Sequence, residues 1–135
     1  EKGGQWEKAV EVFDELQRRG LEPNLITYNA LISAYEKGTQ WKKALQLFDE
    51  LQQRGLEPNI ITYSALISAC EKGDHWGKAL ELFDELQRRG LEPDIFTYGA
   101  LISACGNGGQ WEKALELFDD LQQRGLDPGI ITYNA

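Results

Sequence analysis

Apolar side chains recur along this chain at helical spacing, in two stripes separated by a short polar break. Within residues 25–59, the first stripe follows the i, i+3, i+4, i+7 spacing of one helix face and comprises Tyr28, Leu31, Ile32 and Tyr35. The second stripe also fits one helix face and comprises Trp41, Ala44, Leu45, Phe48 and Leu51. The pattern predicts a first helix over residues 26–37 and a second helix over residues 41–54.

The residues that follow each stripe are helix-ending signals. Gly38 follows the first stripe and Gly55 the second, and glycine is the commonest residue just beyond a helix. Pro58 then prevents the second helix from continuing. We expect Thr39, or Asp74 in the next copy, to cap the second helix by accepting a hydrogen bond from a free backbone N–H.

This two-helix pattern repeats every 35 residues, as four sets of markers show. The markers are Trp6, Trp41, Trp76 and Trp111; Gly20, Gly55, Gly90 and Gly125; Pro23, Pro58, Pro93 and Pro128; and Tyr28, Tyr63, Tyr98 and Tyr133. The chain therefore divides into the second helix of a truncated repeat, three whole repeats and the start of a further repeat, at 1–24, 25–59, 60–94, 95–129 and 130–135. Because both ends are partial repeats, we expect a segment of a longer array.

Neither helix of a unit can bury its stripe alone, so neighbouring units must stack. The predicted fold is all-α, an α-solenoid of stacked helix–turn–helix repeats that forms a right-handed superhelix. First helices should line one face and second helices the other. Cys70 and Cys105 lie one repeat apart, and stacked helices about 10 Å apart are too distant for a disulfide, so we expect buried free thiols.

The net charge of −8 argues, taken alone, against a nucleic-acid partner, because phosphate binding needs lysine and arginine. The distribution changes this picture. The first-helix segments 25–37, 60–72 and 95–107 together carry equal numbers of acidic and basic residues, so the negative charge lies on the second helices and their turns. An acidic outer face keeps an array soluble and leaves the other face available to an anion. No apolar run is long enough to span a bilayer, so we expect no membrane insertion.

The recurring strings Thr-Tyr-Asn, Ala-Leu-x-Leu-Phe and Gly-Leu-x-Pro-Asn, at a period of 35 residues, resemble the pentatricopeptide repeat along the whole chain. One departure is a tryptophan near the start of each second helix, where many members of that family have an aliphatic residue. We interpret it as a core residue, and we expect Trp41 and Trp76 to be buried between successive units.

The resemblance implies an organellar protein, in a mitochondrion or plastid, that binds single-stranded RNA at about one nucleotide per repeat. It would act in RNA processing, stability or translation. In the family, the residue after Thr-Tyr and the residue after the unit's last proline identify the base. The corresponding pairs here are Asn29 with Asn59, Ser64 with Asp94, and Gly99 with Gly129. The alternative is that Asn59 and Asp94 only cap first helices.

The resemblance also implies roles for two further sets of residues. Those expected to sandwich each base are Ile26, Ile61, Phe96 and Ile131, and core packing is the alternative for the isoleucines. Lys37 and Lys72 correspond to lysines that contact the RNA backbone, although a cation at a helix C-terminus also has a favourable interaction with the helix dipole. The fourth copy has Asn107 at this position.

Nothing in the sequence indicates catalysis, so we expect no catalytic residue, no metal and no cofactor. His75 is the single histidine and is interpreted as a surface residue. Carboxylate pairs such as Asp49 and Glu50 recur in each copy and are interpreted as a solvated face. The alternative function is a protein-binding α-solenoid scaffold, or a structural subunit of an organellar assembly such as a ribosome. Other proteins of such a complex would then be partners.

Overall fold

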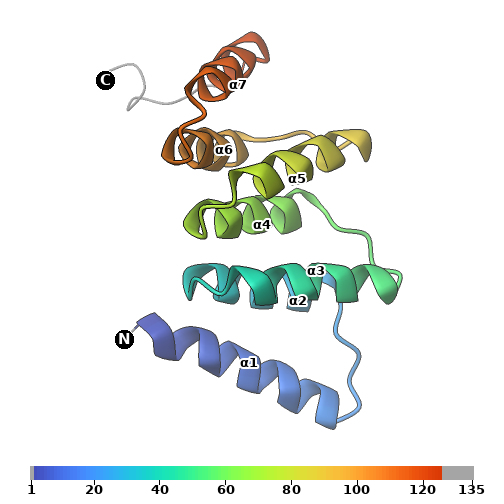
Figure 1. Ribbon diagram of the computed structural model, residues 1–135. Coiled ribbons are helices and arrows are strands. Elements are labelled where there is room, and N and C mark those ends of the chain that lie inside the picture. The colour runs from blue at the N-terminus through green and yellow to red at the C-terminus, as the bar shows by residue number, and fades with distance from the viewer. Residues whose placement is uncertain (1, 126–135) are drawn as a thin grey trace.

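The structure, a computed structural model, describes residues 2–125, and this part of the chain contains seven helices and no strand. The helices are α1 (Lys2–Arg18), α2 (Leu25–Lys37), α3 (Trp41–Gln53), α4 (Ile60–Lys72), α5 (Trp76–Arg88), α6 (Ile95–Asn107) and α7 (Trp111–Gln123). They form one continuous stack from α1 to α7 (Figure 1). The predicted all-α solenoid is confirmed. Gly129, Ile131 and the segment 130–135 lie outside the described residues.

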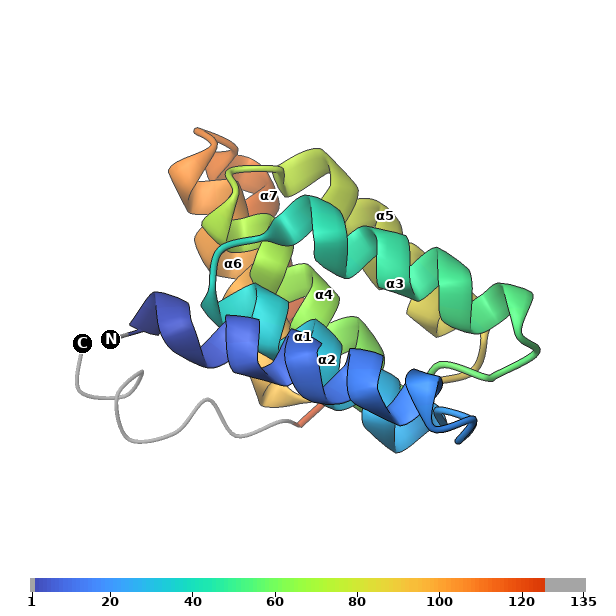
Figure 2. The same cartoon turned by 90° about the horizontal axis from the view of Figure 1, so that it is seen from below.

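First and second helices occupy different sides of the stack, as predicted. Consecutive first helices pack directly on each other, α2 on α4 and α4 on α6. The second helices α3 and α5 keep their Cα atoms more than 8 Å apart and run along one side of the first helices (Figure 2). Since the first helices approach more closely, their side is the tighter, inner side of the solenoid.

A buried tyrosine joins each repeat to its neighbours. Tyr28, Tyr63 and Tyr98 are fully buried, and each ring packs edge-on against a phenylalanine of the preceding second helix. Each hydroxyl also donates a hydrogen bond to a carboxylate on the second helix of its own unit: the acceptors are Glu50 at 2.7 Å, Glu85 at 2.7 Å and Asp120 at 2.5 Å. Burial, and then the hydrogen bond to Glu50, raises the pKa of Tyr28 to about 12.

These hydrogen bonds correct our interpretation of the carboxylate pairs. Asp49 is exposed, as a solvated face requires, but the adjacent Glu50 anchors a buried tyrosine. In each complete unit the tyrosine and its acceptor are 22 residues apart. That constant separation was the available sequence signal.

Trp41 and Trp76 each pack over a glycine of the next unit. Cβ atoms added at Gly73 and Gly108 would collide with the indole rings of Trp41 and Trp76. Glycine therefore ends these first helices because a larger residue would occupy the space of the indole. The two tryptophans lie between successive units as predicted, and they are partly rather than completely buried there.

Replacing Trp76 with alanine is expected to lower the free energy of unfolding by about 2 kcal/mol, less than the ~3–5 kcal/mol for a fully buried aromatic side chain. The reason is that only part of the indole is removed from water. Trp111 has the same position in its unit but is 75% exposed, so Trp111→Ala is the matched control and should cost under about 0.5 kcal/mol. Urea unfolding followed by circular dichroism measures both values, and equal losses would contradict this packing.

The turn between the helices of one unit differs from the predicted cap. Thr39 and Asp74 have left-handed backbones, with φ of 58° and 61°, and neither side chain caps the following helix. Instead, the Gln40 N–H donates to the Tyr35 carbonyl at 2.8 Å, which closes the first helix in a Schellman motif. The capping prediction was wrong because this position ends one helix rather than beginning the next.

The two cysteines are buried free thiols, as predicted. Burial raises the pKa of Cys70 to about 11, which keeps this thiol protonated at neutral pH. Among the described residues, no helix combines the length and the apolar character needed to cross a membrane.

Candidate nucleic-acid interface

Side chains of the three first helices surround one open hollow on the inner side of the solenoid. Its volume is about 440 Å³. Five residues proposed from the sequence line it: Lys37, Ile61, Ser64, Asp94 and Phe96. The other lining residues are Ser33, Glu36, Ala65, Ser68 and Ala100. The fold therefore brings expected base-reading, base-stacking and backbone-contacting residues of three successive repeats into one place.

The expected stacking residues project into solvent. Ile26 and Phe96 are each 78% exposed, and Ile61 is 60% exposed. Their chain neighbours Leu25, Ile60 and Ile95 are instead partly buried and packed on the core. Core packing is therefore excluded as the role of Ile26 and Ile61. Large apolar side chains are left available on this face for a flat apolar surface such as a nucleobase.

The first expected reading pair is hydrogen-bonded across the boundary between two repeats. Asn29 Nδ2 donates to Asn59 Oδ1 at 3.2 Å. Asn59 Oδ1 also caps α4 by accepting from the Thr62 backbone N–H at 3.1 Å, within a capping box. The Thr62 hydroxyl donates to Asn29 Oδ1 at 2.6 Å. Asn29 is 8% exposed, whereas Asn59 is more accessible.

The second pair has the same arrangement with a carboxylate. Asp94 Oδ1 caps α6 by accepting from the Thr97 backbone N–H at 2.9 Å and from the Thr97 hydroxyl at 2.7 Å. Ser64 Oγ lies 3.4 Å from that hydroxyl. Asp94 Oδ2 has no hydrogen bond to any residue within 2–125, and the Asp94 side chain lines the hollow. Capping, the alternative from the sequence, does occur at both pairs. It uses only Oδ1 of each residue and leaves Nδ2 of Asn59 and Oδ2 of Asp94.

The third pair presents no side chain in the described part. Gly99 is exposed, and a Cβ added there would meet nothing within 4 Å. Packing therefore does not require glycine at this position. Its expected partner Gly129 lies outside the described residues.

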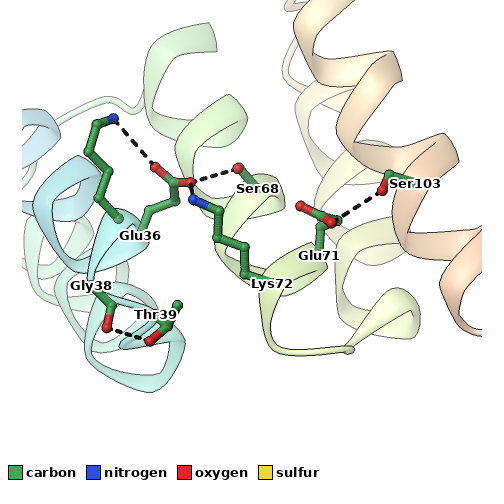
Figure 3. A network of polar contacts seen from close by, with 8 residues as sticks. Glu36, Gly38, Thr39, Ser68, Glu71, Lys72 and Ser103 are labelled. Carbon is green, nitrogen blue, oxygen red and sulfur yellow. Dashed lines mark hydrogen bonds and ion pairs between the residues drawn. The ribbon is translucent and has the colours of Figure 1, made fainter. Parts of the chain in front are cut away.

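The two expected phosphate-contacting lysines differ in how far they are neutralised. Figure 3 shows Ser68 and Lys72 of the next repeat both pointing toward the Glu36 carboxylate. Lys72 Nζ lies 2.5 Å from Glu36 Oε2, and Ser68 Oγ donates to the same oxygen at 2.9 Å. Lys37 Nζ is 3.8 Å from Glu36 Oε1, and its side chain is 72% exposed. Lys37 is thus the more available cation.

The Glu36 network was not predicted from the sequence. Glu36 is only 7% exposed although it is charged, because Ser68 and Lys72 compensate for its burial. The next repeat keeps part of this contact, since Ser103 Oγ donates to Glu71 at 3.2 Å (Figure 3). The recurring glutamate and serine were a signal for it.

His75 is partly exposed and packs against a tryptophan of the preceding repeat. Its ring centroid lies 3.7 Å from that of Trp41, and it is partly buried. The interpretation as a simple surface histidine therefore needs correction. Within residues 2–125, no group of three or more His, Cys, Asp or Glu side chains is arranged to hold a metal ion.

Family models match most of the chain. The model of the pentatricopeptide repeat domain matches residues 11–72 and 81–135, and a PPR repeat model matches residues 61–91. Among curated proteins, a chloroplastic pentatricopeptide repeat-containing protein 10 of Zea mays is 44% identical over 34 residues, which is 25% of this chain and 4% of that protein.

Solved structures with the same architecture have been determined with RNA. The pentatricopeptide repeat protein PPR10 in complex with an 18-nt psaJ RNA element superposes with a TM-score of 0.83 at 36% identity, over 97% of this chain and 19% of that one. The PPR domain of Arabidopsis thaliana protein-only RNase P 1 in complex with tRNA has a TM-score of 0.79 at 18% identity, over 92% of this chain and 66% of that one, and at this identity it supports the fold alone. This chain spans about a fifth of the length of PPR10.

Proposed function

The chain belongs to the pentatricopeptide repeat family, and from this premise we propose that it is a single-stranded RNA-binding module that reads about one nucleotide per repeat. The binding face would be the inner side formed by α2, α4 and α6. The observation that carries the proposal is the hollow where Ser64 and Asp94 lie beside the exposed Ile61 and Phe96. The RNA present in the PPR10 crystal structure supports the same assignment.

Base stacking follows from the exposed apolar residues. A base placed between two successive repeats would contact Ile61 on one side and Phe96 on the other. Stacking on such side chains is favourable for every base and does not discriminate among them. Discrimination must therefore come from the polar pairs.

The hydrogen-bonding group that each pair leaves over suggests which base it prefers. Oδ1 of Asn59 accepts the capping hydrogen bond, so the group left for a base is Nδ2, a donor. A donor suits the N3 acceptor of cytosine better than the N3–H of uracil. Asp94 offers Oδ2, an acceptor, which suits the N1–H and the amino group of guanine. Gly99 should discriminate little. With the 5′ end toward the N-terminus, as the resemblance implies, these units would read 5′-C-G-any-3′.

Because the net charge is −8, we expect modest affinity that falls with salt. Lys37→Ala should weaken binding of all sequences by about threefold to tenfold and lower the salt slope by about 0.7, the value for one phosphate contact on a single strand. Lys72→Ala should have a smaller effect, since Glu36 already neutralises that ammonium group. Fluorescence anisotropy at several salt concentrations tests this. A Lys37→Ala effect limited to one base would contradict a phosphate contact.

The proposed function is tested by comparing RNA forms. At low ionic strength, the 135-residue chain should bind a single-stranded RNA containing 5′-CG more tightly than the same sequence in a duplex, because stacking needs unpaired bases. Equal binding of both forms would indicate non-specific attraction only.

The second candidate is a protein-binding scaffold or a structural subunit of an organellar assembly such as a ribosome. Val12, Trp111 and Leu115 are exposed on α1 and α7, the first and last described helices. Their copies in inner units, such as Leu47 and Trp76, pack on a neighbouring repeat, so this exposure suits a further repeat as well as a partner protein. For the parent protein we propose a role in RNA processing, stability or translation in a mitochondrion or plastid. The chloroplastic maize relative supports an organellar location. We assign no catalytic step to this module.

A further inference from the structure

Resting on the proposed RNA reading, we propose that Thr62 and Thr97 are positioning residues, whose hydroxyls hold each reading pair in the orientation that presents its remaining hydrogen-bonding group to the base. Both threonines lie in the first turn of a first helix and are 0% exposed, so neither can contact RNA itself. Each lies 33 residues after the first member of the pair it touches, in the following repeat. Reading of one nucleotide thus depends on three residues rather than two.

The backbone of α4 fixes the orientation of the Asn59 amide. The Thr62 backbone N–H can only donate, so the atom of Asn59 that faces it, at 3.1 Å, must be the oxygen. Oδ1 of Asn59 therefore points toward the first turn of α4 and caps the helix. Its Nδ2 is the group that points away from the cap and remains for a ligand.

The same cap then orients Asn29. Because Asn59 presents an oxygen toward Asn29, the atom of Asn29 that lies 3.2 Å away must be its Nδ2. Asn29 Oδ1 consequently faces the Thr62 hydroxyl at 2.6 Å and accepts its hydrogen. That hydroxyl also accepts from the Asn59 backbone N–H at 3.1 Å, so its hydrogen is directed toward the asparagine side chains. An Asn29 amide turned by 180° would place its oxygen opposite Asn59 Oδ1. It would also place its NH2 group opposite the Thr62 hydroxyl hydrogen, so Thr62 disfavours that state.

Thr97 has the equivalent place at the second pair. Its hydroxyl and its backbone N–H both hold Asp94 Oδ1, at 2.7 Å and 2.9 Å, which leaves Oδ2 on the side of the hollow. The hydroxyl also lies 3.4 Å from Ser64 Oγ, so it links both members of the pair. Capping and base reading are therefore coupled at each repeat boundary.

Valine has the shape of threonine without the hydroxyl, so Thr62→Val tests the positioning directly. The expected result is that the preference for cytosine over uracil at the first pair falls by about threefold to tenfold, the range of one lost hydrogen bond. Thr62→Ser, which restores the hydroxyl, should recover the preference. Affinities are measured by competition between RNAs that differ at one base.

Thr27→Val is the matched control. Thr27 has the same position in α2, and its hydroxyl bonds to the cap residue Asn24 at 3.0 Å. Asn24 ends the truncated repeat 1–24, so it is not part of a complete reading pair. Thr27→Val should leave both base preferences unchanged. Thr97→Val is a second variant that keeps the test available if Thr62→Val does not fold. It should lower the preference for guanine over adenine at the second pair alone.

The outcomes separate this proposal from the RNA-binding function. If Thr62→Val or Thr97→Val weakens binding of all RNAs equally, or leaves the ratios unchanged, the positioning role is overturned while RNA binding stands. If the wild-type chain binds without any base preference, the proposed reading fails. The positioning is still tested in the free protein, since the side-chain amide signals of Asn29 should shift in Thr62→Val and return in Thr62→Ser. Unchanged Asn29 signals would overturn it.

Discussion

Replacing Asp94 with asparagine is expected to move the preference of the second reading pair from guanine toward adenine, changing the relative affinity about tenfold. Asparagine caps a helix as well as aspartate does, so the cap on α6 should be retained. The atom on the side of the hollow changes from a carboxylate oxygen to an amide nitrogen. It then repels the N1–H of guanine and can donate to the N1 of adenine. Competition between RNAs that differ at this one base measures the shift.

The same substitution also removes one negative charge, which alone would strengthen binding to every RNA. Asp84→Asn makes the same charge change on the exposed surface of α5 and is the matched control. It should raise all affinities slightly and leave the base preference unchanged. A guanine preference that persists in Asp94→Asn would show that this residue does not read the base.

Tyr63→Ala is expected to lower the free energy of unfolding by about 3–5 kcal/mol. The ring is fully buried, packs edge-on against Phe48 with centroids 5.3 Å apart, and donates to Glu85 from its hydroxyl. Its removal leaves a cavity between two repeats and takes from the partly buried Glu85 carboxylate its tyrosine donor, leaving Arg89 Nε at 3.7 Å. Since small domains are stable by only about 5–15 kcal/mol, this variant should be close to unfolding at 37 °C.

Tyr63→Phe separates the two contributions. It keeps the ring and its packing against Phe48 but loses the hydrogen bond to Glu85, so it should cost about 1 kcal/mol. Urea unfolding curves of both variants give the values. Similar losses for the two variants would mean that the hydrogen bond, rather than the buried ring, dominates this contact.

The fold could be predicted because its signals are local. The ends of α2 and α3 were predicted within one residue of those observed, from the apolar spacing and from the glycines and prolines that follow the helices. The separation of first and second helices followed from the need of each stripe to be buried. Free buried thiols at Cys70 and Cys105 followed from the spacing of stacked helices.

Contacts between helices were harder to predict because they depend on how units meet. The Tyr63–Glu85 bond recurs at a constant separation and could have been found by comparing copies. The Glu36–Lys72 ion pair has weaker support, since glutamate and lysine recur in the first three copies but the fourth has Gly106 and Asn107 at these positions. Thr39 was misplaced because its polar side chain suggested a cap, whereas its left-handed backbone ends α2.

At the candidate site, sequence reasoning found residues but treated their roles as alternatives. Asn59 was assigned either to capping or to base reading, and Ile61 either to the core or to stacking. The structure places Ile61 in solvent and shows that Asn59 caps α4 with Oδ1, while its Nδ2 has no hydrogen bond to any residue within 2–125. Which atom of an amide is used is decided by three-dimensional neighbours such as Thr62, and a linear pattern does not contain that information.

Titration of the isotopically labelled chain with a single-stranded 5′-CG RNA, followed by NMR at low salt, tests the central claim most directly. Signals of Ile61, Phe96 and the Asn59 side-chain amide are expected to shift on the first-helix face, while that of the exposed Trp111 indole should stay in place. First-helix signals that do not move, or shifts confined to Trp111 and the other second-helix residues, would contradict RNA reading on this face and favour the protein scaffold.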